Sequence, residues 1–256
     1  MGKLVKIASV ALTAVLVFQV GASNNVRATD TVPPDSLPGP VESTTNVLAT
    51  TTTTVLATTT TTTVPRRVLK PKDIVKISKI HTKKRVVFIT IDDGATVSPE
   101  LAKVLDKHHT PVTTFAMPGM IWRARSWFKA RENMTFENHT NTHAHMTLIS
   151  PRNQRIELCW TNKIIKKIFG ISPIMYRPPR GSWSEENRVA MAKCGLKYAV
   201  LWNVVVESTV PKNLKFHKGD IILLHYVQSL PTVLPEILKK LKKQKLQPAL
   251  LRDYLK

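Results

Sequence analysis

A run of six apolar or β-branched residues, 86–91, ends directly in two adjacent aspartates, Asp92 and Asp93, followed by Gly94. A run of this kind, without polar alternation, is typical of a strand that is buried on both faces, as in a parallel sheet covered by helices. The two carboxylates then stand at the carboxyl end of the strand. We therefore expect the chain to fold around a buried parallel strand that ends in Asp92 and Asp93.

Strand-like and helix-like runs alternate along the rest of the chain. Ser98 and Pro99 have the pattern of a helix N-cap and first residue, Gly170 ends a helical pattern, and Ser182 and Glu185 have capping-box spacing. The expected strands are 86–91, 112–117, 134–137, 174–176, 198–206 and 221–224. Four helices are expected: two cover 150–169 and 233–243, and the other two begin at 98 and at 182. This alternation predicts an α/β fold, a distorted (β/α) barrel with about seven parallel strands.

Chemically reactive side chains follow four of these strands. They are Asp92 with Asp93, His139 with His143, Arg177, and His225. In barrels with parallel strands, the carboxyl ends of the strands build one face, so these side chains should meet at one mouth.

One aspartate and two histidines four residues apart can form a three-ligand metal site that leaves a position open for water, while the second aspartate remains available as a base. Taken singly, each motif is ambiguous. Asp-Asp-Gly is a common turn sequence, and a lone histidine such as His225 is usually packed in a core. The ordered combination is what indicates a metal-dependent hydrolase.

That ordered combination resembles the polysaccharide deacetylase family, the carbohydrate esterases with the NodB homology domain. The first, second, third and fifth motifs of that family match residues 90–94, 139–143, 177–181 and 223–225. The resemblance covers about residues 84–251, which is essentially the whole folded part of the chain.

The resemblance implies a role for each of these residues. Asp93, His139 and His143 would bind a divalent metal, Zn²⁺ or another such as Co²⁺. Asp92 would be the catalytic base, and Arg177 would orient it. The backbone N–H of Arg180 would help stabilise the oxyanion, and His225 would protonate the departing amine.

The chain departs from the family pattern at three positions. The fourth motif of the family places an aspartate behind the catalytic histidine, and Val205 stands at the matching position here, with Glu207 two residues later as a candidate substitute. Tyr226 and Arg180 also replace the acid and the tyrosine that are common in the family. We expect metal binding and water attack to be retained and leaving-group protonation to be weakened.

Aromatic rings suit the faces of sugar rings, so Trp183 and Trp202 are candidates for substrate binding. We expect Trp183 to contact substrate and Trp202 to pack in its strand. Leu223 in the fifth motif is also assigned to substrate binding by the resemblance.

The first 65 residues have the composition of targeting and spacer segments. Lys3 and Lys6 precede an apolar run, 7–20, and small residues follow, which predicts a signal peptide over residues 1–28. Residues 29–65 are rich in Thr and Pro and predict a disordered linker, so the catalytic domain is expected over 66–256. We expect a secreted or wall-associated protein, with no stable membrane insertion after cleavage of the signal.

The chain has a formal net charge of +21, and residues 1–65 carry three basic and three acidic residues. The excess therefore belongs to the expected domain and favours an anionic partner. Nucleic acid is disfavoured by the signal peptide, so anionic cell-wall polymers are the expected partner, and a solvated lysine-rich surface is the alternative. For Cys159 and Cys194 we expect packed thiols rather than a disulfide.

The leading hypothesis is an exported, metal-dependent hydrolase that removes N-acetyl groups from an amino-sugar polymer, either peptidoglycan or a chitin-like oligosaccharide. The alternative is a cell-wall glycan-binding protein that keeps the fold but has weak or no activity because of Val205. A secreted nucleic-acid binder is a third reading, and only the net charge supports it.

Overall fold

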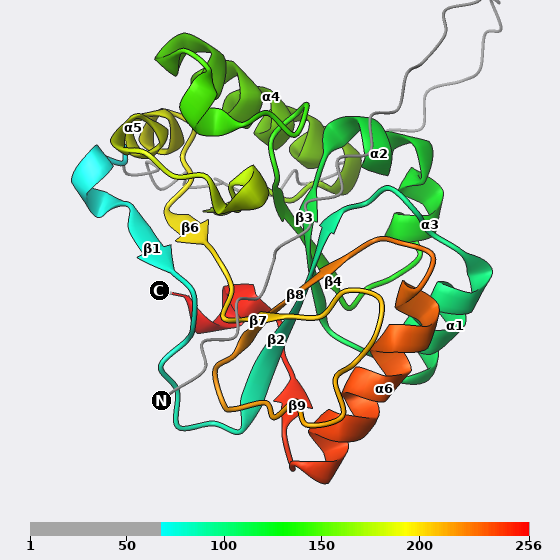
Figure 1. The fold of residues 1–256 in the computed structure, drawn as a ribbon. Helices are drawn as coiled ribbons and strands as arrows, with labels where there is room; N and C mark the ends of the chain where they lie inside the picture. Colours follow the sequence, from blue (N-terminus) through cyan, green and yellow to red (C-terminus); the bar gives the residue numbers. More distant parts are fainter. Residues whose placement is uncertain (1–67, 256) are drawn as a thin grey trace, which may run out of the picture. The chain divides into compact units, whose positions relative to one another are not determined.

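The structure, a computed structural model, describes residues 68–255 (Figure 1). The predicted signal peptide, 1–28, and the predicted linker, 29–65, both lie outside these residues. Among the described residues, none of the helices is both long enough and apolar enough to cross a bilayer.

A curled parallel sheet forms the centre of the fold (Figure 1). Its strands are β1 (Val75–Ile77), β2 (Val86–Asp93), β3 (Val112–Ala116), β4 (Met134–Asn138), β5 (Met175–Tyr176), β6 (Tyr198–Val200), β7 (Val204–Val205), β8 (Ile221–His225) and β9 (Gln247–Pro248). Eight strands follow the order β1-β6-β5-β4-β3-β2-β8-β7, and β9 pairs with β2. Because the ladders between these strands are parallel, the predicted distorted barrel is confirmed, with eight strands on the main path instead of about seven.

Helices cover the outside of the sheet (Figure 1). They are α1 (Pro99–Lys107), α2 (Pro118–Arg123), α3 (Arg125–Lys129), α4 (Pro151–Phe169), α5 (Glu185–Lys193) and α6 (Leu230–Lys243), with 3-10 turns at Pro71–Asp73, Met146–Leu148, Pro179–Gly181 and Leu251–Tyr254. The N-cap of α1 is Ser98, as predicted, and Gly170 ends α4 with φ 73°. The cap of α5 is Ser184, two residues later than predicted, because the Asn187 side chain completes the capping box with it.

Helices α2 and α3 were not predicted, although α2 packs closely on the turn after β2. A Cβ atom added at Gly94 would lie 2.7 Å from Ile121 Cγ2 of α2, and Gly94 has φ 86°. Glycine is therefore required at this position both for space and for backbone conformation.

The two faces of β2 bury different residues, because successive side chains on a strand point to opposite sides. Val87, Ile89 and Ile91 pack with leucines of α1 and α6 in the largest core cluster. Phe88 belongs to a second cluster inside the curled sheet. Asp92 has the same parity as Phe88, so its side chain also points inward, toward the mouth of the barrel.

The predicted strand 198–206 is wrong as a single element. The structure divides it into β6, which pairs with β1 and β5, and β7, which pairs with β8. Between them Asn203 turns the chain: its side-chain amide donates to Asp220 (2.7 Å) and its side-chain oxygen accepts from the N–H of Ile221 (2.8 Å).

A buried carboxylate attaches the C-terminal segment to the sheet. Glu137 on β4 is fully buried and accepts hydrogen bonds from the backbone N–H groups of Ile174 and Met175 and from Arg252 Nε (2.9 Å). Burial raises the pKa of Glu137 to about 7, and Arg252 acts in the opposite direction. The pair keeps the C-terminal turn against the sheet.

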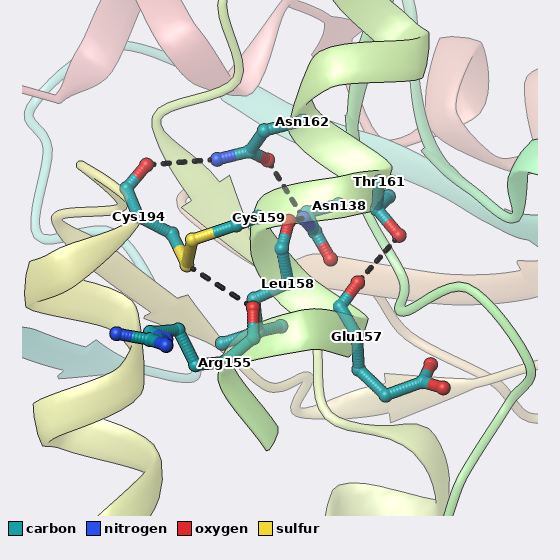
Figure 2. Close-up of a disulfide and its surroundings, with 8 residues drawn as sticks. All are labelled: Asn138, Arg155, Glu157, Leu158, Cys159, Thr161, Asn162 and Cys194. Carbon is teal, nitrogen blue, oxygen red and sulfur yellow. Dashed lines mark hydrogen bonds between the residues drawn. A yellow bond between two sulfur atoms is a disulfide. The ribbon is translucent and has the colours of Figure 1, made fainter. Parts of the chain in front are cut away.

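The expectation of two packed thiols is wrong, since Cys159 and Cys194 form a disulfide between α4 and α5 (Figure 2). The two helices pack side by side, which brings the Cα atoms to 4.9 Å, within the range that a bridge requires.

Replacing both cysteines with serine should lower the free energy of unfolding by about 3 to 4 kcal/mol, because the bridge closes a loop with a sequence separation of 35 in the unfolded chain. Denaturant unfolding of the oxidised protein and of the double variant measures this. Equal unfolding midpoints would contradict a stabilising role for the bridge.

Candidate metal centre

Four strand ends converge at the mouth of the barrel, as expected from their parallel direction. Strand β2 ends at Asp93, His139 follows β4, Arg177 follows β5, and β8 ends at His225. The register of β2 and β8 places the Cα of Asp92 opposite that of His225. The sequence-predicted reactive residues therefore lie at one edge of the sheet.

Asp93, His139 and His143 each direct one ligand atom toward a common point. The three atoms lie within 4.8 Å of one another. His139 Nε2 is 3.5 Å and His143 Nε2 is 3.9 Å from Asp93 Oδ1. Ligand atoms around a tetrahedral zinc ion are roughly 3.4 Å apart, so these side chains fit a metal with little movement.

Two further features of this cluster suit a cation. Asp93 Oδ1 is buried and has no hydrogen-bond partner among the described residues, and a buried carboxylate oxygen is costly unless something compensates its charge. His139 Nδ1 lies 2.9 Å from the backbone oxygen of Arg177. A proton on Nδ1 donated to that oxygen leaves Nε2 as a lone pair facing Asp93, the arrangement common in metal-binding histidines.

The backbone around the cluster is held in an uncommon conformation. Asp93, Thr140, His143 and Arg180 have positive φ values of 78°, 66°, 60° and 57°. Such conformations cost about 1 to 3 kcal/mol each and persist where the surrounding structure imposes them. Burial, followed by the nearby His139, lowers the pKa of His143, which favours the neutral imidazole that a metal requires.

Asp92 stands beside this cluster in a buried ion pair. Arg177 Nη1 donates to Asp92 Oδ1 at 2.7 Å, and both side chains are almost completely inaccessible. Burial lowers the pKa of Arg177, while Asp92 opposes that change. The second carboxylate oxygen, Oδ2, lies 3.7 Å from His139 Nε2 and therefore faces the candidate metal position.

Hydrogen bonds connect α4 to Asn138, the residue directly before His139 (Figure 2). The side-chain amide of Asn138 donates to the backbone oxygen of Leu158 (2.8 Å) and to Asn162 (2.7 Å), and its own oxygen accepts from the N–H of Thr140 (2.9 Å). Asn162 in turn donates to the backbone oxygen of Cys194 (3.0 Å). The network thus connects the disulfide to the residue directly before His139.

Glu157, also on α4, binds the centre of the same loop. Its Oε2 accepts from the backbone N–H groups of Asn141 (2.7 Å) and Thr142 (2.9 Å), and its Oε1 accepts from the Thr142 hydroxyl (2.9 Å). These residues lie between His139 and His143, so Glu157 fixes how the two rings are presented. Sequence reasoning missed Glu157 and Asn162, because nothing in a helical pattern marks which polar residue faces a neighbouring loop.

His225 and Glu207 line one cleft of about 710 Å³ beside the mouth, together with Thr96, Ser208, Val227, Gln228 and Ser229. Val205 is opposite Leu223 in the register of β7 and β8, and its side chain is 44% exposed. Glu207 is two residues further along the chain, in the direction of His225. No described residue supplies a carboxylate at the position of Val205 itself.

The residues assigned to substrate binding lie in different surroundings. Trp183 is partly buried, packs against the cluster between α4 and α5, and has Lys76 and Arg188 near its ring. Trp202 packs inside the sheet, with Arg177 Cζ 5.7 Å from its ring. Leu223 is only 5% exposed. Arg180 is exposed and close enough to His143 to affect its pKa.

The fold and the site together define a distorted (β/α) barrel with a carboxylate and imidazole cluster at its mouth. Residues 79–199 match the family model described as Polysaccharide deacetylase. This match identifies residues 79–199 as a polysaccharide deacetylase domain.

Known relatives agree with this match. A Bacillus cereus protein named peptidoglycan-N-acetylglucosamine deacetylase is 24% identical over 182 residues, covering 62% of this chain and 64% of the relative. Bacillus subtilis PdaA, a family 4 carbohydrate esterase, has 25% identity and a TM-score of 0.59, covering 72% of this chain and 85% of that structure. A family 4 pseudoenzyme from Bacillus anthracis has a similar fold, with a TM-score of 0.61, 23% identity, and coverage of 73% and 70%. The matched regions span 61% to 67% of the first curated relatives.

Replacing Glu157 with glutamine should weaken zinc binding by about 10- to 100-fold, because the substitution removes the negative charge and one of the two oxygens that accept hydrogen bonds from the loop, so that the histidines are held less firmly. Titration calorimetry with Zn²⁺ measures the affinity, and thermal unfolding in chelator reports any general loss of stability.

Glu132→Gln is the matched control, since Glu132 is exposed and lies away from the loop. An unchanged zinc affinity in Glu157→Gln would show that Glu157 does not position the histidines.

Proposed function

We propose that this protein is an exported, metal-dependent hydrolase that removes N-acetyl groups from an amino-sugar polymer, with peptidoglycan as the leading substrate and chitin-like oligosaccharides as the other. The single observation that carries this proposal is the cluster of Asp93, His139 and His143 beside a separate, buried Asp92. The family match supports the reaction class, and the names of the relatives support the substrate class.

Asp93, His139 and His143 would hold the metal, which is Zn²⁺ or another divalent ion such as Co²⁺. When bound, it supplies Lewis acidity for the amide oxygen and for the attacking water. The described residues do the remaining work. Asp92 accepts the proton of the attacking water, and the hydrogen bond from Arg177 holds the Asp92 carboxylate in its orientation. Arg180, at φ 57°, would present its backbone N–H to the oxyanion.

Collapse of the tetrahedral intermediate breaks the C–N bond and requires a proton for the departing amine. His225, at the end of β8 beside the cleft, is positioned to donate it. The products are acetate and a sugar with a free amine. Val205 gives His225 no charged partner, so this step is the slow one.

Export to the cell surface is supported by the sequence pattern of residues 1–65 and by the peptidoglycan-directed names of the relatives. Peptidoglycan is a wall polymer, so a protein that modifies it from outside has to cross the membrane.

A glycan-binding protein without efficient turnover is the second candidate. Val205 at the fourth-motif position and the structural similarity to a family 4 pseudoenzyme favour it. A variant of that pseudoenzyme is described as having restored enzymatic activity, which indicates that such losses can be reversed on this fold.

Purified protein should release acetate from N-acetylglucosamine oligomers, lose this activity in a chelator and regain it with Zn²⁺. Asp92→Asn should lower kcat by about 10²- to 10⁴-fold, because the substitution removes the base. Zinc affinity should remain, since Asp92 is not a ligand. Acetate release by Asp92→Asn at the unaltered rate would exclude Asp92 as the base.

Val205→Asp should raise kcat by about 10-fold or more. Its carboxylate would stand opposite Leu223, two residues before His225 on the same face of β8, where a negative charge favours the protonated imidazole. Val205→Asn, which has the same size without the charge, is the control. If neither variant changes kcat and the unaltered protein already releases acetate efficiently, the lack of a carboxylate at position 205 does not limit the reaction.

A further inference from the structure

A strongly basic surface lies at the end of the sheet opposite the candidate metal centre. It consists of two clefts, which we call the basal clefts. The first cleft has a volume of about 750 Å³ and is lined by Lys79, Ile80, His81, Thr82, Lys83, Arg85, Phe216, His217, Lys218, Gln244 and Leu246. The second cleft has a volume of about 500 Å³ and is lined by Lys212, Asn213, Leu214, Lys215, Glu236, Lys239, Lys240, Lys243 and Gln244.

The residues that line both clefts lie at the amino ends of the strands, in the segments that precede β2 and β8 and at the end of α6. Figure 1 shows the end of α6 close to β9. Arg85 directly precedes β2, and Asp220 directly precedes β8. Strand β2 has eight residues, so Asp93 at its other end is about 25 Å away. A ligand in the basal clefts therefore leaves the mouth of the barrel accessible.

The two clefts are adjacent, because Gln244 lines both of them. Its side-chain oxygen accepts from the N–H of Phe216 at 2.8 Å, which holds the segment before β8 against the end of α6. Arg85 donates to the backbone oxygens of Gln244 and Lys245, and Lys240 donates to that of Lys212. The clefts are thus formed by several elements that bind one another.

Charge is concentrated here beyond the general excess of the chain. Four lysine or arginine residues line the first cleft and five line the second. Among the described residues that line them, Glu236 is the only acidic one. Asp220 lies buried behind the first cleft and pairs with Lys79. Nine basic side chains along two adjacent clefts match a polymer with repeated negative groups better than a single small anion.

The type of side chain favours a polymer without bases. Phe216 is the only aromatic residue among those that line the basal clefts, and it is 4% exposed. Single-stranded nucleic acid is usually bound by exposed aromatic rings that stack on its bases as well as by positive charge. Lysine binds phosphate as a flexible point charge and needs no planar partner.

We infer that the basal clefts bind a linear polyol-phosphate polymer, and that this anchors the domain while the opposite end of the barrel remains free. The inference does not depend on the proposed hydrolase activity, since it concerns binding at a separate surface. The matching polymer in solution is poly(glycerol phosphate).

The test compares two variants of the folded chain with the same net charge. In one, Lys83, Lys215, Lys218 and Lys239 of the basal clefts are replaced by glutamine. In the other, Lys103 and Lys107 of α1 and Lys163 and Lys166 of α4 are replaced in the same way. Binding to poly(glycerol phosphate) is measured over a range of salt concentrations.

We expect the basal variant to bind poly(glycerol phosphate) at least about 10-fold more weakly. The slope of log binding constant against log salt concentration should fall in magnitude by roughly 3, because binding releases fewer counterions. The α1 and α4 variant should bind nearly as well as the unaltered protein. Equal losses in the two variants would overturn the inference, since net charge alone would then explain the binding. Tighter binding to single-stranded DNA with the same number of phosphates would overturn the choice of polymer.

Discussion

Arg177 is the residue on which the arrangement of the site depends. Its guanidinium donates to Asp92 and to the backbone oxygens of Val200 and Leu201, and its Cζ lies 4.1 Å from the ring of Phe115. Its backbone oxygen accepts from the His139 ring. One fully buried cation therefore joins β2, the end of β6 and the histidine loop, and an uncompensated charge at this depth would be strongly destabilising.

A second level of support comes from outside the sheet. Glu157 and Asn162 on α4 bind the loop before and between the histidines, and the bridge from Cys159 fixes α4 against α5. The strained backbone at Thr140 and His143 is held by these contacts. The metal centre is thus organised from two directions, by Arg177 inside the barrel and by α4 outside it.

Local chemistry in the sequence was enough to predict the buried strand β2, the cap of α1 and the end of α4, because each depends on neighbouring residues. It could not predict the division of 198–206, which depends on Asn203 bonding to Asp220 and Ile221. The disulfide was missed for a similar reason, since the separation of Cys159 and Cys194 is set by the packing of two helices. Asp93, His139 and His143 were predicted as a cluster because parallel strands share one carboxyl end and because the ordered motifs resemble those of the polysaccharide deacetylase family.

The most direct measurement of the central claim is anomalous scattering at the zinc edge from crystals of the protein grown with Zn²⁺. The account predicts one strong peak about 2.0 to 2.2 Å from Asp93, His139 Nε2 and His143 Nε2, with Asp92 outside bonding distance. A site without a peak, or a peak bound by other residues while these three point apart, would contradict it.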